Sequence, residues 1–157
     1  MKQKMPEFQK DFEDFISLCN SYELEYLVIG GFAVSIHGYP RTTKDLDICI
    51  NKTEENARKI IKILEDFGFA SLNFSFKDFL KDDIIAQLGY PPVRIDILND
   101  LNGIDFNEAF KNKRVVKMKE VPVNFIGYSE LLINKERSGR QQDLLDIKKL
   151  QDRNKNK

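Results

Sequence analysis

Apolar residues recur along this chain with two periods, one typical of helices and one typical of strands. Residues 7–21 are predicted to form an amphipathic helix, because apolar side chains recur there every three or four positions. Further helices are predicted at 31–39, from the N-cap Thr53 to the stop at Gly68, at 105–112, at 129–137 with Ser129 as its cap, and at 140–151. Short apolar runs predict strands at 26–29, 46–50, 84–88, 93–98, 114–118 and 121–125.

The order of these elements indicates one α/β (α+β) domain, with a mixed sheet of about five strands flanked by helices and a helical C-terminus. We expect the domain to span residues 1–152 and the tail 153–157 to be frayed. Residues 89–92 carry a turn signal between two of the strands. The Phe-rich segment 67–79 fits neither period, and its rings are expected to belong to the core or to a dimer contact rather than to a surface that stacks bases.

Composition and charge exclude several classes of protein. The 157 residues include 25 Lys or Arg and 25 Asp or Glu, and this balance argues against a protein that coats DNA or an anionic membrane. No apolar run reaches the roughly 18 residues of a membrane span, and residues 1–14 lack the apolar core of a signal peptide. Cys19 and Cys49 are too few and too far apart for a zinc or disulfide framework. We therefore expect a cytoplasmic protein with two buried thiols.

Two acids stand at the start of one predicted strand. Asp45 and Asp47 are two positions apart, and side chains alternate along a strand, so both carboxylates point to one face while Leu46 points to the core. Neighbouring carboxylates repel each other unless a cation lies between them, and their hard oxygen atoms suit Mg²⁺. The pair therefore suits Mg²⁺ or Mn²⁺, but such pairs are common in charged sequences, and taken alone each acid is expected to pair with a nearby base.

A third acid lies in the predicted strand 93–98. Asp96 interrupts an apolar, β-branched run and shares one face of that strand with Arg94. An acid in such a strand is costly if it is buried without a partner, so its presence there points to function. If this strand lies beside the strand of Asp45 and Asp47, the three carboxylates form one metal site. The alternative is that each acid pairs with a base, for instance Asp47 with Arg94.

Gly30-Gly31 ends one strand and opens a helix. Without Cβ atoms the backbone can approach a ligand closely, and the N–H groups at a helix start favour phosphate. A simple tight turn is the alternative, and the further glycines of dinucleotide-binding and P-loop motifs are missing. His37, at the end of this helix, is expected to cap or pack rather than to touch substrate.

Taken together, Gly30-Gly31, a spacer of thirteen residues, Asp45-Leu-Asp47 and the later Asp96 resemble the nucleotidyltransferase superfamily, which has the polymerase-β-like fold. The resemblance is to the small bacterial nucleotidyltransferases related to abortive-infection toxins and antibiotic-modifying enzymes. It covers about residues 24–150 and includes His37-Gly38, Arg41 and Thr43, which precede the acids in the order of that group. Many relatives have Gly-Ser in place of the diglycine, so one hydroxyl contact to phosphate is missing here.

The resemblance implies that Asp45 and Asp47 bind two Mg²⁺ ions that carry a nucleoside triphosphate such as ATP. Asp96 would complete the site and could act as general base, while the amides of Gly30 and Gly31 would hold the distal phosphates. The nucleoside monophosphate would pass to a hydroxyl of a small molecule, a protein or an RNA end, and pyrophosphate would leave. The residues expected to face the triphosphate are Arg41, Lys44 and Lys135, with Thr43 orienting the loop.

Other functions stay open at this level. A non-catalytic module on the same fold, for instance half of a toxin–antitoxin pair, would bind nucleotide or a partner protein without turnover. A metal-dependent phosphoesterase would use the same acids, but such sites often contain several histidines and this chain has one. The short chain leaves little room for a substrate domain, so we expect a partner protein, a second copy or an open cleft to complete the acceptor site. Arg140, Asp143 and Asp146 are expected to form ion pairs on a helix surface.

Overall fold

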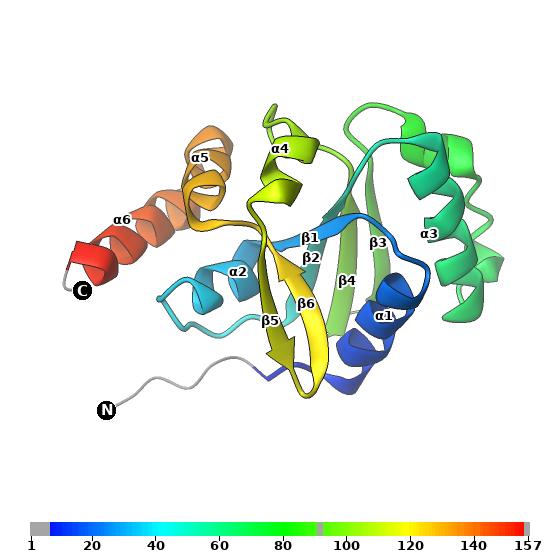
Figure 1. Cartoon of the computed structure of the whole chain (residues 1–157), viewed down its shortest axis with the longest axis horizontal. Helices are drawn as coiled ribbons and strands as arrows, with labels where there is room; N and C mark the ends of the chain where they lie inside the picture. Colours follow the sequence, from blue (N-terminus) through cyan, green and yellow to red (C-terminus); the bar gives the residue numbers. More distant parts are fainter. Residues whose placement is uncertain (1–6, 91–92, 156–157) are drawn as a thin grey trace.

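The computed structural model describes residues 7–90 and 93–155, which form a mixed sheet with helices around it (Figure 1). The α-helices are α1 (Lys10–Ser21), α2 (Gly30–Ile36), α3 (Glu54–Asp66), α4 (Phe106–Lys111), α5 (Tyr128–Ser138) and α6 (Gln141–Lys155). The strands are β1 (Tyr26–Ile29), β2 (Asp45–Ile50), β3 (Ile85–Tyr90), β4 (Val93–Leu98), β5 (Arg114–Met118) and β6 (Val121–Phe125). Two short 3₁₀ helices, η1 (Ala70–Leu72) and η2 (Phe76–Leu80), lie between α3 and β3.

The sheet has six strands in the order β3-β4-β2-β1-β6-β5, one strand more than expected. β2 runs parallel to β4 and antiparallel to β1, while β1 runs parallel to β6. The hairpins β3–β4 and β5–β6 are antiparallel and form the two edges. The two strands that carry the acids, β2 and β4, are therefore direct neighbours near the middle of the sheet, although 48 positions separate the first residues of the two strands.

The core lies where the apolar periodicity places it. Leu46, Ile48 and Ile50 are buried on one face of β2, as the alternation along the strand predicts. Helix α1 brings Phe12 against Phe32 of α2 in an edge-to-face contact with ring centroids 5.7 Å apart. Both thiols, Cys19 and Cys49, are buried and free, as predicted. One face of β2 thus belongs to the core, and the opposite face carries the acids.

Most predicted elements are present, with shifted ends. The N-cap of α3 is confirmed, because the Thr53 side chain accepts a hydrogen bond from the backbone N–H of Asn56. The predicted cap Ser129 is wrong: Gly127 is the N-cap of α5, and no side chain caps that helix. Helix α6 continues to Lys155, so residues 153–155 of the expected frayed tail are helical. Pro91 and Pro92 of the predicted turn lie outside the described residues.

The Phe-rich segment belongs to the core, as expected, and its backbone forms η1 and η2. Phe79 is buried and contacts Phe74, and Phe67 contacts Phe15 of α1. Periodicity does not detect 3₁₀ helices of this kind, because they are too short to show a repeat.

The C-terminal helices α5 and α6 pack against each other at one end of the molecule, away from α3 at the other end (Figure 1). Gly139 joins them in the left-handed conformation, with φ 66°, which ends α5. Among the helices that the structure describes, none is long and apolar enough to cross a membrane.

Candidate functional site

An open cleft of about 440 Å³ lies where the sheet meets α5 and α6. Its walls come from the end of β1 and the start of α2, from β2, β3 and β4, and from the α5–α6 pair. Among the sequence-predicted residues, the cleft contains Gly30, Asp45, Asp47, Asp96 and Lys135. One concave site therefore gathers residues that lie up to 105 positions apart, as a binding or active site requires.

The three predicted acids meet because β2 and β4 pair in a matched register. Asp47 lies opposite Asp96 and Asp45 lies opposite Arg94, so all four side chains share one face of the sheet. Asp45 and Asp47 are half-buried, and Asp96 is 8% exposed. The prediction that the strand of Asp96 lies beside the strand of Asp45 and Asp47 is confirmed.

Arg94 joins two of these acids. Its Nε donates to Asp96 Oδ1 at 2.8 Å, and its Nη2 lies 3.1 Å from Asp96 Oδ2 and 3.2 Å from Asp45 Oδ2. The pairing considered from the sequence, Asp47 with Arg94, is not the one that forms. Residues two apart on one strand and directly opposed residues on neighbouring strands lie within reach of a guanidinium group, so Asp45 and Asp96 receive it.

Asp47 is the acid of this group whose charge is least compensated. Burial, the negative charges of Asp96 and Asp45 and a hydrogen bond shared with Asp96 together raise the pKa of Asp47 to about 7, against a smaller lowering by Lys135. Because its pKa lies near neutrality, Asp47 shares the site with a proton at pH 7 or attracts a cation in its place. A carboxyl group so perturbed in a cleft is a mark of a functional site.

The diglycine fits closely against the acidic strand and the loop before it. Gly30 has φ 69°, and a Cβ atom on it would overlap Asp47 Oδ2 and lie 3.1 Å from Asp47 Cγ. A Cβ atom on Gly31 would lie 2.7 Å from Thr43 Oγ1. Gly30 lines the cleft, whereas Gly31 is buried against Thr43. Helix α2, which starts at Gly30, has seven residues.

Gly30→Ala is expected to lower the free energy of unfolding by about 2–4 kcal/mol, since left-handed strain adds to the displacement of Asp47. Gly68→Ala is the matched control, because Gly68 has φ 98° and a Cβ atom there would meet nothing within 4 Å. That control is expected to lose about 1–2 kcal/mol from strain alone. Urea unfolding of both variants measures the difference, and equal losses would contradict the close contact with Asp47.

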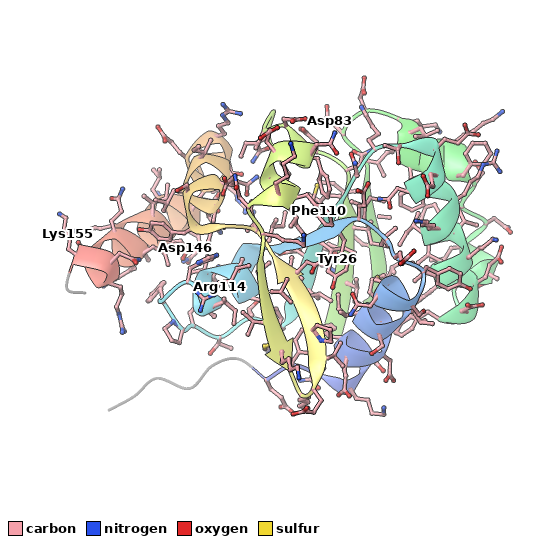
Figure 2. All side chains as sticks on the ribbon, viewed as in Figure 1. Tyr26, Asp83, Phe110, Arg114, Asp146 and Lys155 are labelled. Atoms are coloured by element: carbon pink, nitrogen blue, oxygen red, sulfur yellow. The ribbon has the colours of Figure 1, made fainter. Side chains whose placement is uncertain are left out.

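Lys135 reaches the cleft wall but is held by two acids. It is buried, and its Nζ lies 3.1 Å from Asp143 Oδ1 and 3.0 Å from Asp146 Oδ2. Asp143 also accepts from Arg140 Nε at 2.8 Å, and Asp146 from Arg41 Nη2 at 3.2 Å. These five residues form a charged network that ties α6 to α5 and to the loop before β2; Figure 2 labels Asp146, at the end of the molecule away from Asp83.

This network corrects the prediction of ion pairs on a helix surface. Asp143 and Asp146 are 1% and 0% exposed, because they take inward positions on α6 in line with the buried Leu150, while Leu144 and Leu145 face solvent. Burial alone would raise the pKa of Asp143, but hydrogen bonds from Arg140 and Lys135 and their charges outweigh it and hold that pKa below its usual value. The sequence signal for this burial was the spacing of Asp143, Asp146 and Leu150 at i, i+3 and i+7, which places all three on one face of the helix.

The other predicted phosphate contacts lie elsewhere. Arg41 and Lys44 are not among the described residues that line the cleft: Arg41 pairs with Asp146, and Lys44 is exposed. Thr43 packs on Gly31, and its hydroxyl donates to the Asp45 carbonyl at 3.4 Å, which agrees with a role in holding the loop.

His37 is the C-cap of α2, its Nε2 lies 2.7 Å from the Ile126 carbonyl oxygen, and it packs on Tyr128. The capping and packing role is confirmed.

Sequence reasoning missed several polar residues of the cleft. They come from the β3 edge, the loop after β4 and the α5–α6 junction, and they are Gln87, Asp100, Asn102, Asn134, Ser138, Arg140 and Asp143. Arg140 is the one cation of this set, and its side chain is 77% exposed. Apart from Asp143, whose spacing from Asp146 and Leu150 could have indicated burial, these residues carry no sequence signal, because loops and exposed helix positions are polar in any case.

The chemistry of the acids fits a hard divalent cation, with one qualification in the geometry. Three carboxylates on two adjacent strands offer hard oxygen ligands, and burial together with the charges of Asp96 and Asp45 raises the pKa of Asp47, so a cation beside it would stabilise its ionised form. Among residues 7–90 and 93–155, however, no group of three His, Cys, Asp or Glu side chains is already gathered around one point. Arg94 holds Asp45 and Asp96 in this state. Ligation by all three acids therefore requires Arg94 to leave them.

Comparison with solved structures identifies the fold. A provisionally assigned nucleotidyltransferase from Thermotoga maritima matches with a TM-score of 0.57 and 16% identity over 89% of each chain. An antigenic nucleotidyltransferase-like protein from Paracoccidioides brasiliensis matches with a TM-score of 0.56 and 16% identity, over 89% of this chain and 74% of that one. The antibiotic-resistance factor ANT(2'')-Ia matches with a TM-score of 0.56 and 11% identity, over 89% of this chain and 80% of that one.

No protein-family model matches the chain, and no curated protein sequence does. The structural matches show that the chain has the nucleotidyltransferase fold, as the sequence motifs predict. At this level of identity they show the fold alone, and the chemistry has to be argued from the residues of the cleft.

Proposed function

We propose that this protein is a metal-dependent nucleotidyltransferase, which moves a nucleoside monophosphate from a nucleoside triphosphate onto the hydroxyl of an acceptor and releases pyrophosphate. One observation carries the proposal: the register of β2 and β4 places Asp45, Asp47 and Asp96 on one face of the sheet, in a cleft whose wall includes Gly30. Structural neighbours described as a nucleotidyltransferase and a nucleotidyltransferase-like protein have the same fold and support the same kind of reaction.

In the proposed reaction the acceptor oxygen forms a bond to the α-phosphorus, and the bond from that phosphorus to the oxygen that bridges the α- and β-phosphates breaks. The hydroxyl proton leaves to a carboxylate, and pyrophosphate carries away the electron pair. Mg²⁺ or Mn²⁺, when bound by Asp45, Asp47 and Asp96, supplies charge neutralisation and activates the attacking oxygen. Both oxygens of Asp96 accept hydrogen bonds from Arg94, so Asp96 can take a proton once Arg94 has moved.

The cleft also supplies positive charge for the triphosphate. Arg140 lines it with a largely exposed guanidinium group, and the buried Lys135, paired with Asp143 and Asp146, lines it too. Gly30 lacks a side chain, so its backbone leaves room beside Asp47. We assign Arg140 and Lys135 to the phosphates, and Asp45, Asp47 and Asp96 to the metal.

The test is an assay of pyrophosphate release with each of the four nucleoside triphosphates and Mg²⁺, over a panel of small-molecule, protein and RNA acceptors. We expect release with at least one triphosphate and a loss of about a thousandfold in Asp45→Asn. Asp11→Asn is the matched control, because Asp11 is an exposed acid on α1 and is not among the described residues that line the cleft. Nucleotide binding without turnover over the whole panel would indicate the non-catalytic module instead.

A further inference from the structure

Arg94 takes the place that a cation would take between two of the acids. Its guanidinium contacts Asp96 through Nε and Nη2, at 2.8 and 3.1 Å, and Nη2 also reaches Asp45 at 3.2 Å. Bidentate contact with one carboxylate and a third bond to another are strong, charge-assisted interactions. Each of these oxygens is one that a metal ion would use.

We propose that Arg94 is a positioning residue that holds Asp45 and Asp96 together in the metal-free protein and is displaced when a divalent cation binds. The inference rests on the metal-binding part of the proposed function. A single guanidinium carries one positive charge, whereas three carboxylates carry up to three negative charges. A divalent ion therefore compensates the site better than Arg94 can, and Arg94 lowers the affinity for that ion by competing for the same oxygens.

The surroundings of Arg94 allow it to move. Its side chain is 28% exposed, so its charge can pass into solvent at little cost. On the side away from Asp45 it lies opposite Gly89 of the edge strand β3, and Gly89 is exposed and has no side chain. Asp47 lies opposite Asp96 on the neighbouring strand, and the hydrogen bonds of Arg94 go to Asp96 and Asp45, so the Asp47 carboxyl group stays available to an incoming cation.

The two roles of Arg94 make opposite predictions for its removal. A side chain that only stabilises the fold would, when replaced, lower stability and leave metal affinity unchanged or weakened. A side chain that competes with metal would, when replaced, lower the stability of the metal-free protein and raise the affinity for metal, because the free energy that Arg94 contributes without metal is lost on binding.

The experiment titrates Mn²⁺ into the chelator-treated full chain without nucleotide, follows free Mn²⁺ by electron paramagnetic resonance, and measures thermal unfolding with and without the ion. Arg94→Gln is expected to bind Mn²⁺ about tenfold more tightly than wild type, to unfold at a lower temperature without metal, and to gain more on adding Mn²⁺. Arg94→Lys keeps the positive charge but loses the paired guanidinium hydrogen bonds, so its affinity for Mn²⁺ is expected to lie between those of wild type and Arg94→Gln. Arg58→Gln, in an exposed ion pair on α3, is the control and should bind Mn²⁺ as wild type does.

Equal or weaker Mn²⁺ binding by both Arg94 variants would overturn the inference and leave the proposed function standing. No Mn²⁺ binding by any variant or by wild type would overturn both the inference and the metal dependence of the proposed function. If the variants do not fold, hydrogen exchange of the Arg94 Nε proton in the wild type tests the same inference. This exchange should become faster on adding Mg²⁺, and an unchanged rate would count against displacement of Arg94.

Discussion

Asp47→Asn is expected to be inactive and, without metal, more stable than the wild type at pH 8. Under the proposed function, loss of this carboxylate removes a metal ligand that is worth several kcal/mol in the transition state, so pyrophosphate release should fall about a thousandfold. The stability should change in the opposite direction. Burial and the charges of Asp96 and Asp45 penalise the ionised form of Asp47, and an asparagine amide of the same shape carries no charge and can still bond to Asp96.

The pH dependence of this gain follows from the direction of the pKa shift. The pKa of Asp47 is raised from 3.8 in the unfolded chain to about 7 in the fold, so below pH 3.8 both states are protonated and the penalty is absent. As the pH rises from there to about 7, the unfolded state loses its proton first, and the wild type loses stability relative to the variant. Above pH 7 the full difference is present, about 2–4 kcal/mol.

Urea unfolding of wild type and Asp47→Asn in chelator, at several pH values from 4 to 8, measures this difference. Asp11→Asn, on the exposed face of α1, should show little difference from wild type at any pH. A variant that is less stable than wild type at pH 8 would mean that Asp47 is compensated in the metal-free fold, which would remove the electrostatic reason to expect a cation there.

Lys135→Met is expected to lower the free energy of unfolding by about 3–5 kcal/mol at pH 7, the usual effect of breaking a buried ion pair. Lys135 is buried, and its two partners Asp143 and Asp146 keep Arg140 and Arg41 but lose the ammonium group between them. The methionine side chain retains the packing of the lysine stem, so the loss measures charge rather than volume.

The effect should depend on pH in the sense set by Asp143. The pKa of Asp143 is held below 3.8 in the fold, so the stability that its ionised form brings is present above that pH and is lost as the pH falls through the lowered pKa. The difference between wild type and Lys135→Met should therefore shrink in acid. Lys149→Met, at an exposed position of the same helix α6, should cost less than about 0.5 kcal/mol.

Unfolding in urea at pH 7 and at pH 3 compares the two variants. If Lys135→Met unfolds like the control but loses affinity for nucleotide, the lysine acts on phosphate and not on the two acids of α6. If it loses stability as expected, its positive charge is committed to Asp143 and Asp146 before any nucleotide arrives. In that case Arg140, with its exposed side chain, supplies most of the positive charge that a triphosphate meets first.

In the strands that carry the acids, side-chain alternation predicts the face on which each side chain lies. The alternation in 45–50 places Asp45 and Asp47 on one face and Leu46, Ile48 and Ile50 on the other, because successive side chains of any strand point to opposite sides. The same rule places Arg94 with Asp96. It does not say which strand lies beside which, and the pairing of Asp47 with Asp96 rather than with another residue comes from the packing of the whole sheet.

The C-terminal helices show where local pattern fails. Asp143 and Asp146 look like surface residues, since charged side chains are rarely buried unless they are paired. Their partners Lys135 and Arg41 come from another helix and from the loop before β2, so a reading of α6 by itself cannot detect them. Arg41 is thereby directed to Asp146 rather than into the cleft.

By itself, the sequence determined most of the helices and strands and the face to which each acid points, because periodicity and side-chain alternation act between residues close in the chain. The nucleotidyltransferase fold was predicted from the resemblance of the diglycine and Asp-Leu-Asp motifs to that superfamily. The tertiary structure alone decided the six-strand order, the guanidinium fork of Arg94 on Asp45 and Asp96, and the buried network around Lys135. Each of these depends on residues brought together from distant parts of the chain, where contact depends on packing and not on spacing.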